Sequence, residues 1–488
     1  MASFTQKVAK NIIFQSLGRI LSLVLGLVVV MMMTRYLGPT GFGYYTTITA
    51  FLQIFGVIAS FGLYLVFLKM LGEFSDKEEE GQAGIEKLVS NFFTLRLISA
   101  VIFFALAPIV ALFFPYPGIV KFGIALTSLA FIFSELNQIL VAFYQKILET
   151  DKVMIAEISG RLGLLALIFL FIKFDFGFYS ILVAIIIGSF LNFLFLFLAS
   201  KKFIRIKLIF DFNLWKEIFS QAWPVALSLI FNLVYFRMDT IVLSLYRLPL
   251  EVGIYGATYR VLEVLIMFPP MFIGLVLPQL SQAWLEKNLE RFKNIFQKSF
   301  DFLVMVAVPL LFATLILADR IMVFVAGSEF IASGQVLRII ILATSILFVA
   351  ELFKQTIVAI EKQRQIIWFY FISAIISLVG YFVFIPRYSY FAAAWVTVLV
   401  EALMFLFPLI LILKTTKAYL NLNFLGKSLL ASLIMFFILL VFRQLSLLVL
   451  ILLAILVYLG VLYLLKGISK SLIKEIVSSF LPLGKNNK

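Results

Sequence analysis

Twelve charged side chains stand inside the long apolar runs of this sequence, and their types and spacing are the first guide to its chemistry. Six are basic and six are acidic: Arg19, Arg96, Arg161, Arg237, Arg260 and Lys354, and Glu135, Glu157, Asp239, Glu263, Glu351 and Glu401. If the apolar runs cross a membrane, each such charge costs about 2.5–3.5 kcal/mol to insert and is expected to face a partner or a cavity. Arginine suits phosphate, because its planar guanidinium donates two parallel hydrogen bonds to it.

Three pairs of these charges are close enough in sequence to share one face of a helix. They are Glu157–Arg161, Arg260–Glu263 and Glu351–Lys354, at spacings of four, three and three residues. Side chains at these spacings are neighbours on a helix. For each pair, an ion pair that only offsets the cost of burial is therefore the alternative to a functional role.

Arg19, Arg96 and Arg237 have no acid at that spacing, so they would have to supply the positive charge of any cationic cavity. Arg19 lies about 14 Å along the first apolar run at about 1.5 Å per residue, which makes it the strongest candidate for contact with an anionic substrate. Snorkelling or a pair with another helix is the alternative for it.

Two groups of site residues are predicted from these charges. The predicted contacts to an anionic substrate are Arg19, Arg96, Arg237, Arg260 and Lys354. The predicted contacts to a coupled proton or sodium ion, or to sugar hydroxyls, are Glu135, Asp239, Glu263 and Glu351. Plain hydrogen bonding between helices is the alternative for the acids.

The composition sets the class of protein that positions these charges. Hydrophobic residues make up 63% of the chain and charged residues 13%, with a mean hydropathy of +1.12, whereas soluble domains are about 45–50% apolar and about 25% charged. We expect an all-α polytopic membrane protein. The sequence has no cysteine and no histidine, so thiol and imidazole chemistry are excluded, and we predict no catalytic residue, no metal and no cofactor.

The apolar runs predict about fourteen transmembrane helices, because a span needs about 20 apolar residues. The expected spans are 10–34, 43–70, 88–114, 119–147, 152–173, 177–200, 219–245, 252–283, 293–317, 335–360, 364–385, 390–413, 424–442 and 446–466. Most Lys and Arg between the spans fall on the side of the N-terminus, so we expect both termini in the cytoplasm. The net charge of +15 then reflects cytoplasmic loops, and no nucleic-acid partner is predicted. No P-loop pattern occurs, which argues against direct use of ATP.

A short motif occurs twice and predicts an internal repeat. In "TRYLGPTGFGYY" (34–45), Pro39, Gly43 and Tyr45 match Pro249, Gly253 and Tyr255 at a constant spacing of 210 residues. "SELNQILVA" (134–142) similarly resembles "AELFKQTIVA" (350–359). We predict two six-helix lobes in a parallel repeat, 1–207 and 208–420, followed by the last two helices and a basic cytoplasmic tail in 421–488. Chance similarity between apolar sequences is the alternative. The predicted hinge-turn residues are Gly38, Pro39, Gly43, Pro249 and Gly253.

The first copy of the motif resembles the first helix–loop–helix of Wzx-type oligosaccharide flippases, polysaccharide transporters of the MOP exporter superfamily. The residues that carry the resemblance are Thr34, Arg35, Leu37, Gly38, Pro39, Gly43 and Tyr45. The resemblance implies a two-lobed transporter, not an enzyme. It would flip a polyprenyl-pyrophosphate-linked oligosaccharide across the cytoplasmic (inner) membrane by alternating access, for cell-surface polysaccharide biosynthesis. Basic residues on the first helix of such proteins meet the pyrophosphate, and Arg19 fits that role best here.

Three other functions stay open at this point. A lipid II-type flippase and a MATE-like drug exporter share the implied fold, but the first two expected helices carry only Arg19 and Arg35 as strong bases. A polyprenyl-dependent membrane glycosyltransferase or polymerase needs catalytic acids near a membrane surface, and the outer loops are short. Besides the lipid bilayer and the lipid-linked oligosaccharide, the expected partners are H+ or Na+ and the glycosyltransferases or polymerase of the same pathway.

Overall fold

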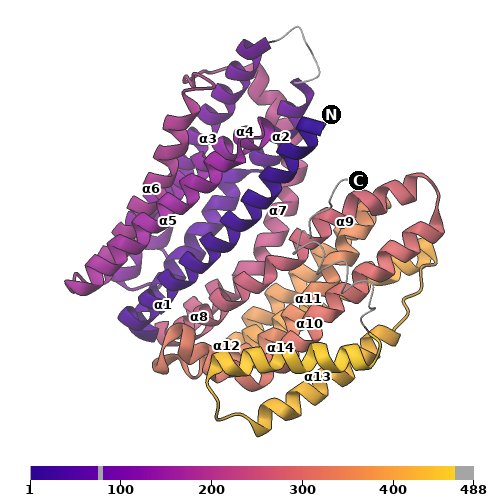
Figure 1. Cartoon of the computed structure of the whole chain (residues 1–488). Helices are drawn as coiled ribbons and strands as arrows, with labels where there is room; N and C mark the ends of the chain where they lie inside the picture. The colour runs from indigo at the N-terminus through magenta and orange to yellow at the C-terminus, as the bar shows by residue number, and fades with distance from the viewer. Residues whose placement is uncertain (1, 75–80, 468–488) are drawn as a thin grey trace, which may run out of the picture. The chain divides into compact units, whose positions relative to one another are not determined.

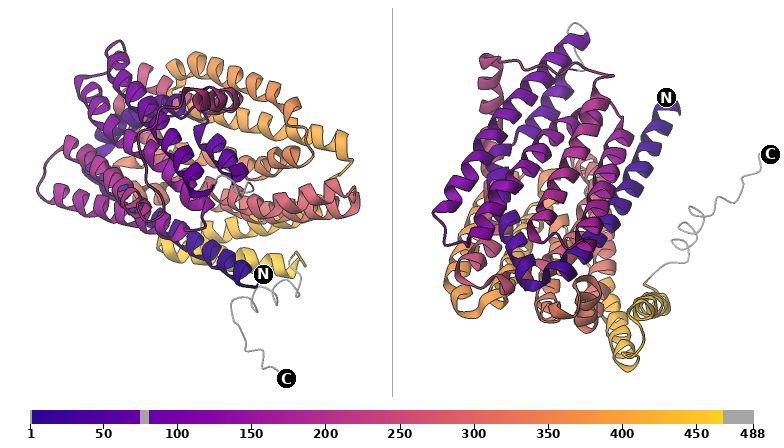
Figure 2. Two further views of the ribbon diagram at one scale, coloured as in Figure 1. Left: turned by 90° about the horizontal axis from the view of Figure 1, so that it is seen from above. Right: turned by 90° about the vertical axis from the view of Figure 1, so that its left-hand side faces the viewer.

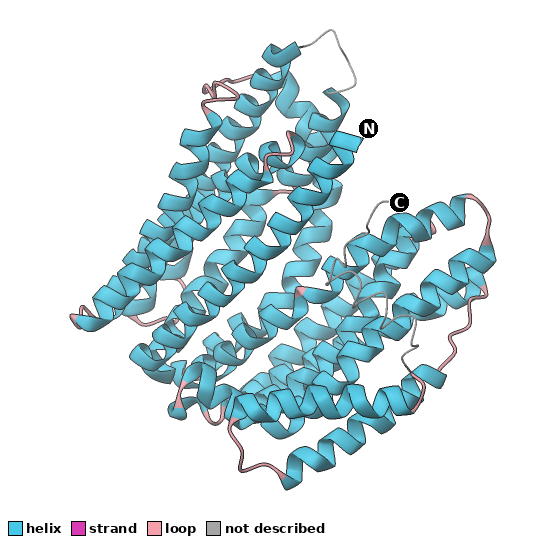
Figure 3. Ribbon diagram, in the orientation of Figure 1, coloured by secondary structure: helices cyan, strands magenta, loops and turns pink. Residues whose placement is uncertain are grey.

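The computed structural model describes the backbone of residues 2–74 and 81–467, and side chains in these ranges except 2–17, 19–20, 74, 81–82, 228 and 230–236. The described residues form fourteen α-helices and one 3-10 helix, joined by short loops (Figures 1 and 3). The predicted basic tail beyond residue 467 lies outside the described residues.

The elements follow each other in one order along the chain. They are α1 (Ala2–Ser60), α2 (Leu63–Phe74), α3 (Gly81–Leu112), α4 (Gly118–Lys146), α5 (Thr150–Lys173), α6 (Phe178–Ser200), α7 (Phe212–Tyr246), α8 (Pro249–Ile266), α9 (Phe268–Leu285), α10 (Leu289–Ala326), η1 (Ser328–Phe330), α11 (Ser333–Ala359), α12 (Gln363–Thr416), α13 (Asn423–Val441) and α14 (Leu447–Leu464).

Two of these helices are each broken once by a residue outside the helical region. In α1 the break is at Gly38 (φ 62°, ψ −179°), directly before Pro39, and in α12 it is at Ser389 (φ 54°, ψ −141°). A straight helix of 59 residues would be about 90 Å long, three times the apolar thickness of a bilayer. Each broken helix therefore carries two of the expected spans, 10–34 with 43–70 and 364–385 with 390–413.

The expected span 252–283 corresponds to one apolar segment, Pro249–Leu285, which is made of two helices, α8 and α9. The break lies at Met267, two residues before the pair Pro269 and Pro270. A proline lacks the N–H that the helix needs and clashes with the preceding turn, so two in a row start a new helix. A second break, at Phe61 and Gly62, both with positive φ, separates α2 from α1 within the expected span 43–70.

Eleven segments of the described chain are long and apolar enough to cross a membrane. Two of them, Leu21–Glu73 and Gln363–Thr416, each cover two expected spans, whereas α7, which carries the expected span 219–245, is not among the eleven. The chain is thus an all-helical, multi-pass membrane protein.

The helices divide into two compact units. Unit 1 is Met1–Arg260, Val325–Phe330 and Tyr370–Ala393, and unit 2 is Val261–Phe324, Ile331–Phe369 and Ala394–Lys488. This division by contact differs from the lobes 1–207 and 208–420, which are a prediction about repetition in the sequence.

Unit 1 has a bundle of long helices at its centre. In it, α4 packs against α3 and α6, and α5 packs against α1 and α6 (Figure 2). The helices α5 and α6 approach closely at Gly160 and Gly188, where a Cβ on Gly160 would lie 2.9 Å from the carbonyl oxygen of Gly188. In unit 2, α13 and α14 pack together, and the Tyr458 hydroxyl bonds to Ser428 and to the carbonyl of Met305 in α10.

Candidate functional site

The two copies of the repeated motif lie against each other in unit 1. A Cβ on Gly43 would lie 1.8 Å from the carbonyl oxygen of Pro249, and a Cβ on Gly253 would lie 1.9 Å from the carbonyl oxygen of Pro39. Only glycine allows such an approach. Pro249 opens α8 and Pro39 follows the break in α1, and both positions suit proline because the first turn of a helix needs no N–H donor. We call these four residues the seam.

The surroundings of the seam are also closely packed. Gly256 faces Thr46 on α1, and the ring of Phe42 contacts Tyr45 and Phe330. Beyond the end of α7, the Arg247 guanidinium donates to the carbonyls of Ile385 (3.3 Å) and Arg387 (3.1 Å), next to the break in α12. The Arg247 contacts tie the start of α8 to α12 within unit 1.

Asp239, a predicted ion-coupling residue, is fully buried near the end of α7 and is surrounded by donors. Its Oδ2 accepts hydrogen bonds from the hydroxyls of Tyr255 and Tyr259, both at 2.7 Å. Its Oδ1 accepts from the backbone N–H and the hydroxyl of Thr240 at 2.5 and 3.1 Å. Among the side chains that the structure describes, these four bonds come from neutral donors, whose dipoles strengthen in a low-dielectric interior. The positive charge of Arg237, two residues earlier on α7, also acts on the carboxylate.

The expectation that Arg96 lacks an acidic partner is wrong. Arg96 on α3 is fully buried and forms an ion pair with Glu135 on α4. It also donates to the carbonyl of Ala59 and to Gln138 Oε1, at 3.3 and 3.0 Å. The partner lies on a different helix, so sequence spacing does not reveal it. A fully buried, fully bonded guanidinium holds three helices together and presents no face to a substrate.

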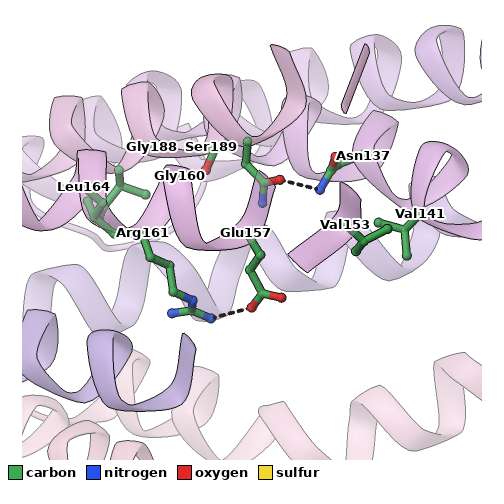
Figure 4. A pocket seen from close by; sticks show the side chains of 11 residues that line it. Asn137, Val141, Val153, Glu157, Gly160, Arg161, Leu164, Gly188 and Ser189 are labelled. Carbon is green, nitrogen blue, oxygen red and sulfur yellow. Dashed lines mark hydrogen bonds and ion pairs between the residues drawn. The ribbon is translucent and has the colours of Figure 1, made fainter. Parts of the chain in front are cut away.

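The pair Glu157–Arg161 forms as predicted, with Arg161 Nη2 3.4 Å from Glu157 Oε1. Both side chains line a cavity of about 270 Å³ between α4, α5 and α6 (Figure 4). Asn137 and Asn192 line it as well. Glu157 also accepts a hydrogen bond from Ser22, so α5 contacts α1 through this pair.

Unit 2 holds a second of the three predicted pairs. Lys354 Nζ lies 2.7 Å from Glu351 Oε2 on α11, and Gln355 donates to the same carboxylate at 3.0 Å. These groups are mostly buried, and the spacing of three residues predicts their contact correctly.

The remaining predicted residues are spread over both units. Arg237 is half-buried on α7, and the guanidinium of Arg260 lies 5.6 Å from the centre of the Tyr45 ring. Glu263 follows in α8, in unit 2. Arg19 lies in α1, and its side chain is outside the described residues.

Sequence analysis missed the two tyrosines that hold Asp239. Tyr255 was noted only as a repeat match, yet Tyr255 and Tyr259 are four residues apart on α8 and present both hydroxyls to one carboxylate. A Tyr-x-x-x-Tyr pattern in a membrane helix could have signalled a buried polar partner.

Solved structures show which fold this chain shares with known proteins. The lipid II flippase MurJ in an inward closed conformation matches with a TM-score of 0.76 over 92% of this chain and 98% of the other, at 17% identity. An inward-facing multidrug resistance MATE family transporter of the MOP superfamily matches with a TM-score of 0.66 over 83% and 99%, at 13% identity. Such identities show the fold alone, and the fold is that of the MOP-superfamily transporters.

The chain belongs to the polysaccharide biosynthesis protein family, which matches residues 8–284. The MatE family matches residues 224–383. Among curated proteins, the probable low-salt glycan biosynthesis flippase Agl15 of Haloferax volcanii is 27% identical over 126 residues. That match spans 26% of the relative and 26% of this chain. The resemblance drawn from the motif at 34–45 is confirmed, and the family is one of transporters, not enzymes.

Proposed function

We propose that this protein flips a polyprenyl-pyrophosphate-linked oligosaccharide across the cytoplasmic membrane by alternating access. Membership of the polysaccharide biosynthesis protein family supports the class of substrate, and so does the similarity to a probable glycan biosynthesis flippase. An isoprenoid carrier keeps such a substrate in the bilayer, and its pyrophosphate suits arginine.

The observation that carries the mechanism is the reciprocity of the seam. Gly43 of the first motif contacts Pro249 of the second, and Gly253 of the second contacts Pro39 of the first. Reciprocal contacts of this kind are what a two-fold axis produces between equivalent segments. They support a parallel repeat of six helices, 1–207 and 208–420. Our proposal also includes fourteen spans in total and both termini in the cytoplasm, as the distribution of Lys and Arg between the spans favours.

The proposed site follows from the charges that remain after the geometry is considered. Arg19, Arg237, Arg260 and Lys354 are the proposed substrate contacts, with Arg19 first. Arg96 is removed from this group, and Glu135 with it, because the two are paired and the guanidinium has no exposed surface, whereas the pair Lys354–Glu351 keeps part of its surface exposed.

Three acids keep their proposed role in ion coupling. Asp239, Glu263 and Glu351 are the candidates for a coupled H+ or Na+, and Asp239 has the most enclosed carboxylate of the three. Its four neutral donors stabilise the ionised form, so a cation or proton that arrives there must compete with them.

Arg19→Ala tests the substrate contact in sealed vesicles that hold purified protein and a lipid-linked oligosaccharide. We expect the rate of translocation to fall at least about tenfold, as loss of one charge-assisted contact implies, with partial rescue by Arg19→Lys. Arg443→Ala, an exposed arginine between α13 and α14, is the matched control. An unchanged rate at normal protein levels would remove Arg19 from the site. Glycan transfer or elongation without translocation would overturn the flippase itself.

A further inference from the structure

The segment that joins α6 to α7, residues 201–211, begins with a turn at 201–203 and then runs along α3 without forming a helix or strand, and we call it the strap. Three of its alternate residues, Arg205, Lys207 and Ile209, each donate the backbone N–H to a side chain of α3. The acceptors, in the same order, are Glu86 Oε1, Ser90 Oγ and Thr94 Oγ1, each at 3.1 Å.

The spacing of these bonds explains why the strap follows the helix so closely. Two residues of extended chain advance about 6.6 Å, and four residues of helix advance about 6.0 Å. Each step along the strap therefore keeps nearly in register with one turn of α3. The strap ends at Asp211, whose N–H donates to Asn91 Oδ1 and whose carboxylate lies 2.8 Å from Lys87 Nζ.

Because its backbone makes these bonds, the strap leaves many of its side chains exposed. Four bases, Lys201, Lys202, Arg205 and Lys207, are exposed. Three large apolar side chains close behind them are also exposed: Leu208 (60%), Phe210 (57%) and Phe212 (72%). We call these seven residues the strap surface.

Nearby groups shape the strap surface without neutralising it. The rings of Phe210 and Phe212 lie 5.8 and 5.3 Å from that of Trp215, whose indole N–H is fixed by Asn91. Among the described residues, Asp211 pairs with Lys87, and Glu86 accepts the backbone N–H of Arg205, so this one carboxylate faces four bases and leaves a positive balance.

The strap surface also lies at the boundary of apolar spans. It begins directly after Ser200, the last residue of the span Phe178–Ser200, and follows the first turns of the span Ala83–Leu112. Bases mixed with aromatic and aliphatic side chains at such a boundary match the chemistry of a headgroup layer: cations meet phosphates and rings sit at the interface.

We propose that the strap surface binds the anionic phospholipid headgroups of the leaflet at that end of the bundle. The proposal concerns a contact with bulk lipid, separate from transport, and it stands whatever the protein carries. Bound lipid would hold the connection between α6 and α7 at the membrane surface.

Fluorescence quenching by brominated lipids tests this contact on the full chain. The protein has five tryptophans, and Phe at 223, 284, 368 and 395 leaves Trp215 as the reporter beside the strap surface. We compare brominated phosphatidylglycerol with brominated phosphatidylcholine in vesicles of equal bromolipid content. Each base near an anionic surface adds preference, so we expect at least about a threefold preference for phosphatidylglycerol, weakening as salt rises above about 0.1 M.

The variant K202Q/R205Q/K207Q should bring that preference close to one. Its strap should stay in place, because the bonds to α3 come from backbone N–H groups, and slow amide exchange at residues 205, 207 and 209 checks this. The matched control K287Q/K293Q/K298Q changes three bases in unit 2 and should keep the preference. Equal quenching by both lipids in the parent chain, or an unchanged preference in the strap variant with its amides still protected, would overturn the proposal.

Discussion

The seam predicts that one methyl group will change which conformation this protein prefers. In Gly43→Ala the new Cβ would lie 1.8 Å from the carbonyl oxygen of Pro249, 2.6 Å from its carbonyl carbon and 3.1 Å from the backbone nitrogen of Gly253. All three atoms belong to the backbone at the start of α8. No side-chain rotation relieves the overlap, so α1 and α8 must move apart.

The size of the effect follows from these distances. A carbon and a carbonyl oxygen come no closer than about 3.3 Å in ordinary contacts, so the seam must widen by about 1.5 Å. Overpacking of this kind costs about 1–3 kcal/mol. If one state of the transport cycle closes the seam and another opens it, the ratio of their populations should shift about 5–150-fold toward the open seam.

Spin labels measure this shift without interference, because the chain has no native cysteine. Thr40→Cys and Leu250→Cys place labels at two exposed positions beside the seam. We expect one short distance in the parent chain and a longer, dominant distance in Gly43→Ala. The controls Gly72→Ala and Gly426→Ala add a methyl group where no atom lies within 4 Å, and neither should alter the distances. An unchanged distance distribution in a folded Gly43→Ala protein that transports normally would refute the reasoning.

Three further predictions concern charged groups of unit 1. Arg96→Met leaves Glu135 buried without its guanidinium, so stability should fall by about 3–5 kcal/mol, seen as a lower midpoint of thermal unfolding; an apolar residue at both positions should recover most of it. Asp239→Asn should abolish any dependence of translocation on an H+ or Na+ gradient, and a dependence that survives would end the ion-coupling proposal. The hydrogen bond from Lys87 holds the pKa of Asp211 below its usual range. The stabilisation that the ionised Asp211 gives to the start of α7 is therefore present above the pKa of Asp211 in the unfolded chain and lost as pH falls through its pKa in the folded chain. The protection of the Leu214 amide against exchange should decrease below about pH 4 in the parent chain but not in Asp211→Asn.

Breaks between helices were visible in the sequence wherever backbone chemistry causes them. Gly38 and Pro39 interrupt α1 as predicted, since glycine adopts a positive φ and proline cannot continue the preceding helix. Similarly, α12 is broken at Ser389, between the expected spans 364–385 and 390–413. The break before Pro269 was missed although proline signals it, because the span 252–283 was assigned from its continuous hydropathy alone.

Contacts within one helix were predictable, and contacts between helices were not. The pairs Glu157–Arg161 and Glu351–Lys354 follow from spacing. The partner of Arg96 is 39 residues away, and only the packing of α3 on α4 brings the two together. The seam is the exception, because repetition at a fixed spacing pointed to equivalent segments that a two-fold axis can place in contact.

The connection between the predicted lobes shows why composition misjudges a linker. In the sequence, the joint between the predicted lobes falls after residue 207, in a stretch that only separates two expected spans, 177–200 and 219–245. In the structure that joint is the strap, whose N–H groups bond to α3 from residue 205 to residue 211. The acceptors Glu86, Ser90 and Thr94 are four residues apart on α3, and the donors are two residues apart on the strap. This agreement involves two segments far apart in the sequence, so neither segment alone reveals it. The strap therefore anchors the chain after α6 to α3. If the predicted lobes move relative to each other, the backbone must bend after Asp211, in α7 or later.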